Sequence, residues 1–259
     1  ITSISLSVLL GSFLTIFGPI NERNKEHRKI NISIKSKRNE KRSLINRKSD
    51  LLLFSDNKLE RFIRLEELIN KWEDLIIKNH DLDVSGFFLS LDNKTYAEIK
   101  SNNRLPAASS IKVPILIVLL TMIDKGELLW NENLTLTEDT IGSGSGWMAY
   151  QEIGKKFPVF EVASEMIRVS DNTATNILIK RMGGTNIINQ KFKEIGLNNT
   201  HINNLLPDLD GTNLTSTKDL SLAMAIVDSG YILNLRSRDI FREIMQKSKT
   251  NSLIPSGIL

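Results

Sequence analysis

The stretch SSIKVPILIVLLTMI, residues 109–123, holds the most informative pattern of the chain. Its last eleven residues are apolar on nearly every helical face, which is typical of a fully buried helix. A membrane-spanning helix needs about 20 residues, so this stretch is too short to cross a bilayer comfortably. Pro114 fits only if the helix begins nearby, at Ser109 or Ser110, because proline is tolerated in a first turn. The stretch therefore predicts a helix in the centre of a folded domain.

Helical and strand patterns lie on both sides of this central helix. Apolar spacing predicts an amphipathic helix over residues 56–79. Two strands, over residues 84–91 and 95–99, are predicted to be joined by a turn at residues 92–94. Further helices are predicted over residues 159–168, 172–182, 217–229 and 237–247. Gly183, Gly184 and Gly230 stand where helices would end, and Ser216 with Asp219 can form a capping box at the start of the helix over residues 217–229. A two-stranded ribbon is marginal alone, so the sheet needs further strands.

The composition excludes several classes of enzyme. The 259 residues include no cysteine, which rules out cysteine nucleophiles, disulfides and thiolate metal sites. The three histidines, His27, His80 and His201, are far apart in sequence and form no metal-binding motif. We therefore expect no metal and no cofactor, and a histidine-based triad is not indicated.

The basic charge of the chain is confined to one short segment. Residues 21–50 hold eleven Lys and Arg and four Asp and Glu, which gives a net charge of +7. Residues 1–20 are uncharged, and the whole chain carries +4. Residues 51–259 therefore carry 4 − 7 = −3. The apolar residues 1–20 predict a membrane anchor or a signal segment. Residues 21–50 predict a basic flexible linker. Residues 51–259 then form the globular domain, for which no nucleic-acid partner is expected.

Ser109 and Lys112 form the first candidate catalytic pair. Residues three apart on a helix face the same side, so the lysine amine can reach the Ser109 hydroxyl, whereas Ser110 faces elsewhere. A serine hydroxyl needs a base to take its proton, and a lysine serves only if its pKa falls from about 10.4 toward 7. Burial against an apolar helix lowers a lysine pKa in this way. The same four letters also fit a helix cap followed by a surface lysine.

Ser170-Asp171-Asn172 forms a second candidate motif, between two predicted helices and 61 residues after Ser109. A serine on such a loop can relay a proton to a leaving-group nitrogen. An asparagine can hold a substrate amide, because it offers both a donor and an acceptor. Alone, this tripeptide is equally a good helix cap.

Together, the two motifs resemble the active-site signature of class A β-lactamases and penicillin-binding enzymes. The resemblance covers residues 58–259 and includes the strand pair, the buried helix and the sequence SDNTATNILIKRMGG. It implies an α+β fold of the β-lactamase/transpeptidase type, an antiparallel sheet with an all-helical subdomain, the sheet being incomplete in this chain. The roles it implies are acylation of Ser109, a base at Lys112, proton transfer by Ser170, substrate positioning by Asn172 and bracing of the loop by Asp171. Trp147 is either an aromatic wall of the cleft or a packing residue.

Two departures from the family pattern affect the expected activity. No lysine-threonine-glycine motif is present, and Lys249-Thr250-Asn251 is a poor substitute because asparagine cannot make glycine's close approach. We therefore expect that the chain is truncated, with this motif and the remaining strands following Leu259. The stretch 198–217 also lacks the glutamate that frees the acyl-enzyme in class A β-lactamases. Its only acids are Asp208 and Asp210, so the acyl-enzyme should persist unless one of them acts as the base.

The sequence leaves several functions open. The leading hypothesis is a monomeric serine hydrolase acting on a β-lactam or a peptidoglycan peptide. The alternatives are a penicillin-binding or D,D-peptidase-like protein with slow deacylation, a catalytically silent membrane-tethered domain of the same fold, and a lipid or nucleic-acid binder acting through residues 21–50. The resemblance implies a bacterial protein, membrane-anchored or exported, with the domain on the extracytoplasmic side. The positive charge of residues 21–50 favours the cytoplasmic side instead.

Overall fold

The computed structural model describes residues 62–81 and 83–249, all of which belong to one unit. The predicted membrane segment, residues 1–20, and the predicted linker, residues 21–50, lie outside the described residues. Within the part that is described, no helix combines the length and the apolarity required to cross a bilayer.

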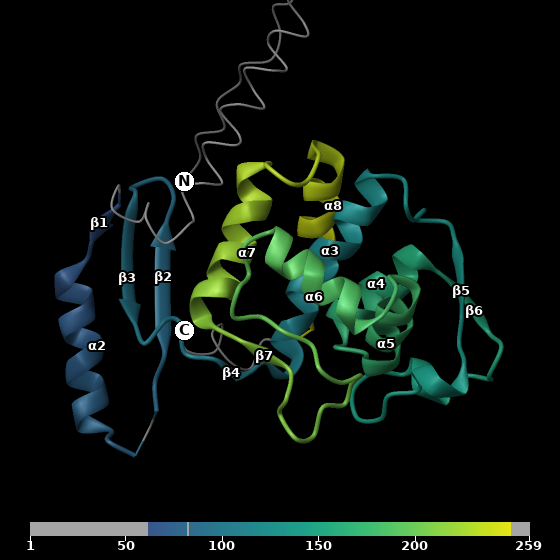
Figure 1. The fold of residues 1–259 in the computed structure, drawn as a ribbon, viewed down its shortest axis with the longest axis horizontal. Coiled ribbons are helices and arrows are strands. Elements are labelled where there is room, and N and C mark those ends of the chain that lie inside the picture. The colour runs from purple at the N-terminus through teal and green to yellow at the C-terminus, as the bar shows by residue number, and fades with distance from the viewer. Residues whose placement is uncertain (1–61, 82, 250–259) are drawn as a thin grey trace, which may run out of the picture. The chain divides into compact units, whose positions relative to one another are not determined.

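A small sheet with one helix on it forms the first layer (Figure 1). Strands β2 (Gly86–Ser90) and β3 (Thr95–Ile99) are antiparallel, and β1 (Ile63–Arg64) pairs parallel with β3. Helix α2 (Glu66–Lys78) packs on β3. The two predicted strands are confirmed, and β3 has the predicted bounds.

The predicted helix over residues 56–79 is wrong at its start. Residues 56–61 lie outside the described residues, and Ile63–Arg64 form strand β1 instead of a helical turn. The backbone N–H groups of Ile63 and Leu65 donate to Lys94 O and Tyr96 O, both at 2.8 Å. The edge of β3 thus satisfies these donors, and the helix begins only at Glu66, where Glu66 and Glu67 supply negative charge at its N-terminus.

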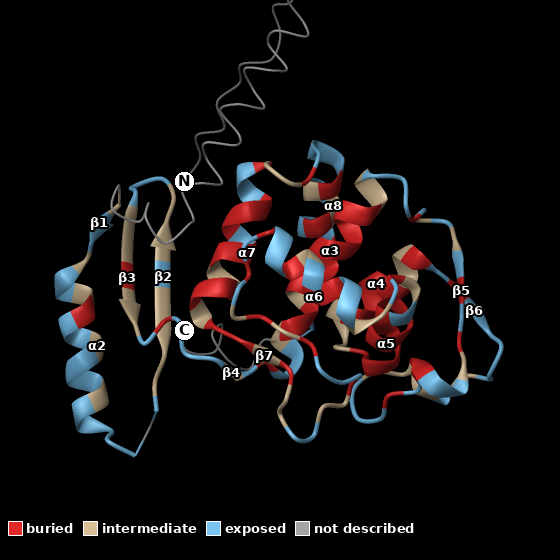
Figure 2. Ribbon diagram, in the orientation of Figure 1, coloured by how far each residue is buried: buried red, intermediate tan, exposed pale blue. Residues whose placement is uncertain are grey.

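Six helices of the described residues form a block beside the sheet (Figure 1). They are α3 (Lys112–Asp124), α4 (Val159–Arg168), α5 (Asn172–Arg181), α6 (Thr185–Glu194), α7 (Thr217–Ser229) and α8 (Leu235–Gln246). The central helix α3 contacts each of the other five. Figure 2 shows α3 as buried along most of its length, whereas α2 is largely exposed. Helix α7 lies next to the sheet, where Ser221 Oγ donates to Phe87 O of β2.

The predicted helices of this block are confirmed, and one was missed. Helices α4 and α7 have the predicted bounds, α5 ends one residue early, and α8 begins two residues early because the Asn234 side chain caps it. Helix α6 was not predicted. It buries only Ile188, Asn189 and Phe192, so its apolar pattern is weak in a mostly polar sequence.

The capping box predicted at the start of α7 forms only in part. The Ser216 side chain accepts a hydrogen bond from Asp219 N at 3.1 Å, as predicted. The Asp219 carboxylate instead accepts from Asn199 N and Thr200 Oγ1, both at 2.8 Å. Asp219 thus ties α7 to the start of the 198–217 loop.

Short strand pairs and one-turn helices link the longer elements of the block. Strand β4 (Leu105–Pro106) pairs with β7 (Leu214–Thr215), and β5 (Asn133–Thr135) pairs with β6 (Lys156–Pro158). Three 3₁₀ turns are η2 (Ala108–Ile111), η3 (Glu138–Thr140) and η4 (Met148–Tyr150). Since β4 directly precedes η2, the β4–β7 pair fixes the approach of the chain to Ser109.

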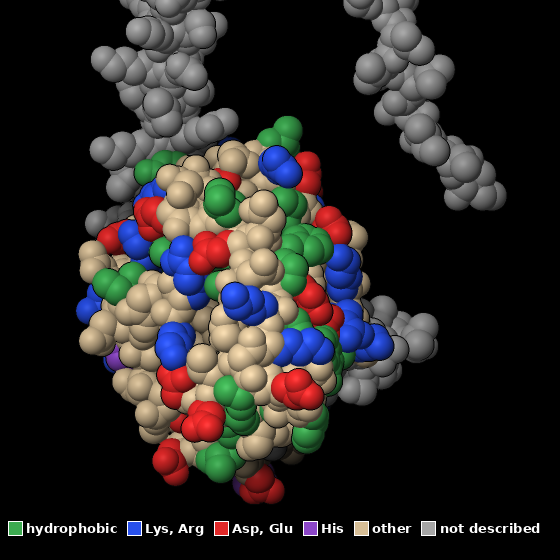
Figure 3. Space-filling view, turned by 90° about the vertical axis from the view of Figure 1, so that its right-hand side faces the viewer, with side chains coloured by type: hydrophobic (Ala, Val, Ile, Leu, Met, Phe, Trp, Pro, Cys, Tyr) green, Lys and Arg blue, Asp and Glu red, His purple; other side chains and the backbone are tan. Residues whose placement is uncertain are grey.

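Figure 3 shows the face of the molecule at its β5–β6 end. Basic and acidic side chains alternate there with apolar ones, and no continuous patch of one sign covers this face.

Candidate active site

Ser109 lies in the one-turn helix η2, directly before α3, and is exposed to solvent. Ala108, immediately before it, has a φ of 44°, a left-handed conformation that is costly for a residue with a Cβ. The neighbouring backbone is held by a 2.7 Å bond from Ala107 N to Asn213 O. Ser110 donates its hydroxyl to Ala107 O at 2.5 Å, so it faces away from Lys112, as predicted.

Lys112 is the first residue of α3 and is only 2% exposed. Its Nζ lies 3.3 Å from Ser109 Oγ and 2.9 Å from Ser170 Oγ. It also lies 2.6 Å from Ser170 O and 2.9 Å from Asn172 Oδ1. One amine therefore contacts both candidate serines and the candidate substrate-binding amide.

Burial lowers the pKa of Lys112 to about 8, and the negative charge of Asp171 opposes part of this effect. A neutral amine has two protons and one lone pair. The carbonyl oxygens of Ser170 and Asn172 cannot donate, so they take the two protons. The lone pair is left for a hydroxyl proton, which is the arrangement that a general base requires.

Ser170 lies in the turn between α4 and α5, half-buried, with a φ of 58°. Its hydroxyl is 2.8 Å from Ser109 Oγ. Ser109, Lys112 and Ser170 thus form a closed set of hydrogen bonds, although 61 residues separate the two serines.

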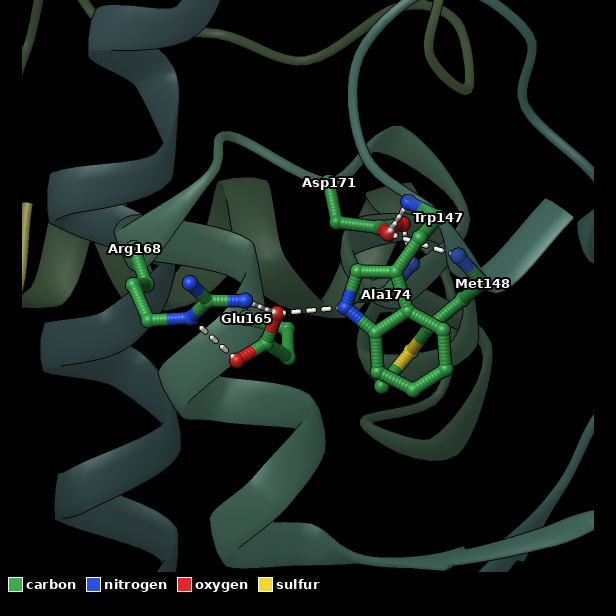
Figure 4. A network of polar contacts seen from close by, with 6 residues as sticks. All are labelled: Trp147, Met148, Glu165, Arg168, Asp171 and Ala174. Carbon is green, nitrogen blue, oxygen red and sulfur yellow. Dashed lines mark hydrogen bonds and ion pairs between the residues drawn. The ribbon is translucent and has the colours of Figure 1, made fainter. Parts of the chain in front are cut away.

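Asn172 and Asp171 fasten this turn to the loop 142–147. Asn172 donates from Nδ2 to Ser143 O at 2.7 Å, and its backbone N donates to Ser145 O at 3.1 Å. Asp171 is fully buried and accepts from Trp147 N, Met148 N and Ala174 N at 2.7 to 2.9 Å (Figure 4). Asp171 is therefore placed to brace the loop and to cap α5.

Trp147 has the contacts of a packing residue. Its ring is half-buried against the core and meets Phe157 edge-on, with the centroids 5.9 Å apart. Its indole Nε1 donates to the Glu165 carboxylate at 2.6 Å. These are packing contacts, and a role of Trp147 as a wall of the cleft stays a prediction.

Glu165 and Asn176 were not singled out by the sequence analysis. Glu165 pairs with Arg168 through both carboxylate oxygens, each bond 2.6 Å long (Figure 4).

Asn176 holds the 198–217 loop by accepting from Leu206 N at 2.8 Å and donating to Leu206 O at 2.6 Å. Only Asn176 had a sequence signal, because it is four residues after Asn172 and so lies on the same face of α5.

The two acids proposed for deacylation differ in their surroundings. The Asp208 carboxylate accepts from Thr212 Oγ1 and Asn213 N within its own loop. Burial raises the pKa of Asp208, but these hydrogen bonds outweigh burial and the net pKa lies below its ordinary value. Asp210 is exposed at the loop tip. In Lys249-Thr250-Asn251, the stretch compared above with the lysine-threonine-glycine motif, only Lys249 is among the described residues. Its backbone N donates to Arg168 O.

Comparison with known proteins gives matches over most of the chain. A model of the beta-lactamase enzyme family matches residues 64–259. Beta-lactamase BRO-1 of Moraxella catarrhalis is 28% identical over 183 residues, which cover 68% of this chain and 56% of that protein. The chain thus spans little more than half the length of this curated relative.

Solved structures extend the comparison. A mutant of PBP-A, solved as an acyl-enzyme complex with penicillin G, is 40% identical, with a TM-score of 0.73 over 75% of this chain and 74% of that one. A mutant of the last common ancestor of Gram-negative class A beta-lactamases is 18% identical, with a TM-score of 0.64 over 71% of each chain, and this likeness concerns the fold alone. The α+β fold predicted from the sequence is therefore confirmed.

Proposed function

Because this chain belongs to the beta-lactamase enzyme family, we propose that it is a serine acyl hydrolase, whose Ser109 is acylated by β-lactams. The observation that carries this proposal is the placement of a buried amine, with a pKa of about 8, against the hydroxyls of Ser109 and Ser170. This is the arrangement that turns a serine into a nucleophile.

The proton transfers of acylation are assigned to residues of this cluster and to the substrate. The neutral Lys112 amine takes the hydroxyl proton as Ser109 Oγ attacks the lactam carbonyl carbon. The tetrahedral intermediate collapses by breaking the carbon–nitrogen bond of the ring. Ser170 gives its hydroxyl proton to the departing nitrogen and receives one from the Lys112 ammonium at 2.9 Å. Lys112 ends neutral, and Ser109 carries the acyl ester.

Asn172 is the residue that we assign to substrate positioning. Its side chain is already held at both ends, by Lys112 at Oδ1 and by Ser143 O at Nδ2. The amide has a second Nδ2 proton, which can bind a substrate carbonyl without breaking either bond. Asp171 acts indirectly, by keeping this turn in place.

Slow deacylation is favoured by the surroundings of the two loop acids. Asp208 is engaged in its own loop, and Asp210 is exposed, so neither shows the features of a base that activates water. The alternative function, a penicillin-binding or D,D-peptidase-like protein that keeps its acyl group, therefore has specific support. The 40% identity to PBP-A, seen as a penicillin G acyl-enzyme, points in the same direction.

The location of the domain belongs to the same proposal. Peptidoglycan peptides and β-lactams act outside the cytoplasm, so we place the domain on the extracytoplasmic side of a bacterial membrane, as a monomer held through residues 1–20. Protease treatment of intact spheroplasts tests this, because digestion of the domain is expected there. Protection until lysis would contradict it.

A fluorescent penicillin separates the two functions. The protein should take up the label covalently, and Ser109→Ala should take up none. Ser110→Ala, the matched control one residue away, should still be labelled. Loss of the label within minutes would identify a β-lactamase, and retention for hours would identify the penicillin-binding alternative. Absence of labelling in the wild-type protein would contradict both functions and favour the silent domain.

A further inference from the structure

Three residues outside the reacting group are joined in a closed ring of hydrogen bonds, of which the bonds from Trp147 are drawn in Figure 4. Trp147 Nε1 donates to the Glu165 carboxylate, and Trp147 N donates to the Asp171 carboxylate. Asp171 N in turn donates to Glu165 O at 3.2 Å. Each residue is thus held by both of the others, and the ring connects the end of α4, the turn after it and the loop 142–147.

The ring contains two carboxylates, and that of Glu165 accepts from the indole of Trp147. Glu165 is buried, with 8% exposed, and Arg168 pairs with both of its carboxylate oxygens. The hydrogen bonds from Arg168 lower the pKa of Glu165; burial opposes them, and the bond from Trp147 adds to the lowering. Glu165 therefore stays ionised at neutral pH, and an ionised acceptor makes a stronger hydrogen bond to the indole N–H than a neutral one would.

The ring surrounds the backbone that places Ser170. Residues 165 to 171 include Ser170, whose positive φ persists only if neighbouring contacts hold it. The peptide group that joins Ser170 to Asp171 is held at both of its polar atoms, because Asp171 N donates to Glu165 O and Lys112 Nζ donates to Ser170 O. The loop 142–147 also supplies the carbonyls of Ser143 and Ser145 that fasten Asn172.

We propose that Glu165 is a positioning residue, which holds Trp147 and thereby keeps the Ser170 hydroxyl in register with Ser109 and Lys112. This inference rests on the proposed acylation of Ser109. Glu165 acts through Trp147 and the turn, and touches neither substrate nor the reacting atoms.

Trp147→Phe tests the ring directly. Phenylalanine keeps an aromatic ring against Phe157 but lacks the indole N–H that Glu165 accepts. In the full chain, stopped-flow acylation by a fluorescent penicillin yields the maximal acylation rate and the apparent dissociation constant separately. Misplacing a catalytic group by about 1 Å costs roughly a hundredfold, so the maximal rate should fall about 10- to 100-fold with an unchanged dissociation constant.

A second substitution and a matched control separate positioning from general stability. Glu165→Gln keeps an oxygen that can accept from Trp147, so it should lose less of the acylation rate than Trp147→Phe. Glu132→Gln alters another carboxylate–arginine pair, which is more exposed and lies at the C-terminal end of α5 with Arg181, and it should leave the rate unchanged even where its melting temperature falls.

Three outcomes would overturn the inference. If the wild-type protein is not acylated, the proposed function fails and the inference fails with it. If the wild-type protein is acylated and Trp147→Phe reacts at the same maximal rate, the inference alone fails. If only the dissociation constant of Trp147→Phe rises, Trp147 is a substrate-contacting wall and Glu165 has no positioning role.

Discussion

The Lys112 amine sets the pH dependence of the proposed reaction. With a pKa of about 8, roughly a tenth of the amines are neutral at pH 7, since the pH is one unit below the pKa. The acylation rate should therefore rise about tenfold per pH unit below 8 and level off above it. Pre-steady-state labelling between pH 5.5 and 9.5 measures this, at constant ionic strength. A rate independent of pH across this range would show that Lys112 is not the base.

Gly146 is a residue of the loop 142–147 whose missing side chain lets the loop approach Asp171. A Cβ at this position would overlap the Asp171 carboxylate, and the φ of 97° is already unfavourable for other residues. Gly146→Ala should therefore lose at least about 3 kcal/mol of unfolding free energy, from backbone strain and overpacking together, and most of the acylation rate.

Gly154→Ala provides the matched control for Gly146→Ala. Gly154 has a similar φ of 90°, but nothing lies within 4 Å of its Cβ position. It should lose only about 1 to 2 kcal/mol, from backbone strain, and keep the acylation rate. Urea unfolding together with labelling distinguishes the two variants. Equal effects would mean that contact with Asp171 does not matter.

Sequence patterns indicated the residues of the cluster and, through the family resemblance, the bracing residue Asp171, but not Glu165 or Asn176. Ser109 and Lys112 were predictable because a three-residue spacing on a helix fixes their relative direction. Ser170 and Asn172 came from a motif. Glu165 could not be found in this way, since a single acid in an amphipathic helix has many uses, and only the fold brings Trp147 to it.

At the level of elements, Asn176 connects α5 to the 198–217 loop. Leu206 is 6% exposed, and the Asn176 side chain is its partner for both backbone N–H and C=O. Asn176→Ala leaves both groups unpaired in a buried place, at a cost of about 2 to 4 kcal/mol of unfolding free energy. Amide hydrogen exchange should become faster in residues 198–217, while helix α8 keeps its protection.

Asn203→Ala is the control from the same loop. Its side chain is exposed and donates to Thr212 O at 2.6 Å, where water can replace it. We expect a loss below about 1 kcal/mol and no change in exchange around Leu206. Unchanged exchange of the loop in Asn176→Ala would show that other contacts hold it.

The elements that could be predicted are those whose burial leaves a clear period in the sequence. Helix α4 and helix α7 bury one face each, and α3 is apolar all round, so their positions follow from the pattern. Strand β1 shows no such pattern, because both of its residues are exposed and only the edge of β3 selects the strand. Helix α6 buries too little to be recognised beside the Gly183-Gly184 pair.

Across the whole molecule, the site combines three segments that are distant in sequence. The start of α3, the α4–α5 turn and the loop 142–147 meet around one buried amine. The predicted order of helix, strands and helical block was sufficient for the fold class, whereas the expectation that residues 109–112 and 170–172 share a site came from the resemblance to a known family.

The same buried amine should link the stability of the fold to pH. Because the folded-state pKa of Lys112 is about 8 against an ordinary 10.5, the unfolded chain binds the proton more tightly than the folded chain between these values. Burial of Lys112 therefore lowers the unfolding free energy below pH 8. The unfolding free energy rises by roughly 3 kcal/mol as the pH increases from 8 toward 10.5. Lys112→Met has no titrating group at this position and should lack this rise. Between pH 7.5 and 10.5, the unfolding free energy of the wild type should therefore gain roughly 3 kcal/mol relative to that of the variant. Urea denaturation at each pH measures it, and parallel curves for the two proteins would mean that burial does not depress the lysine pKa.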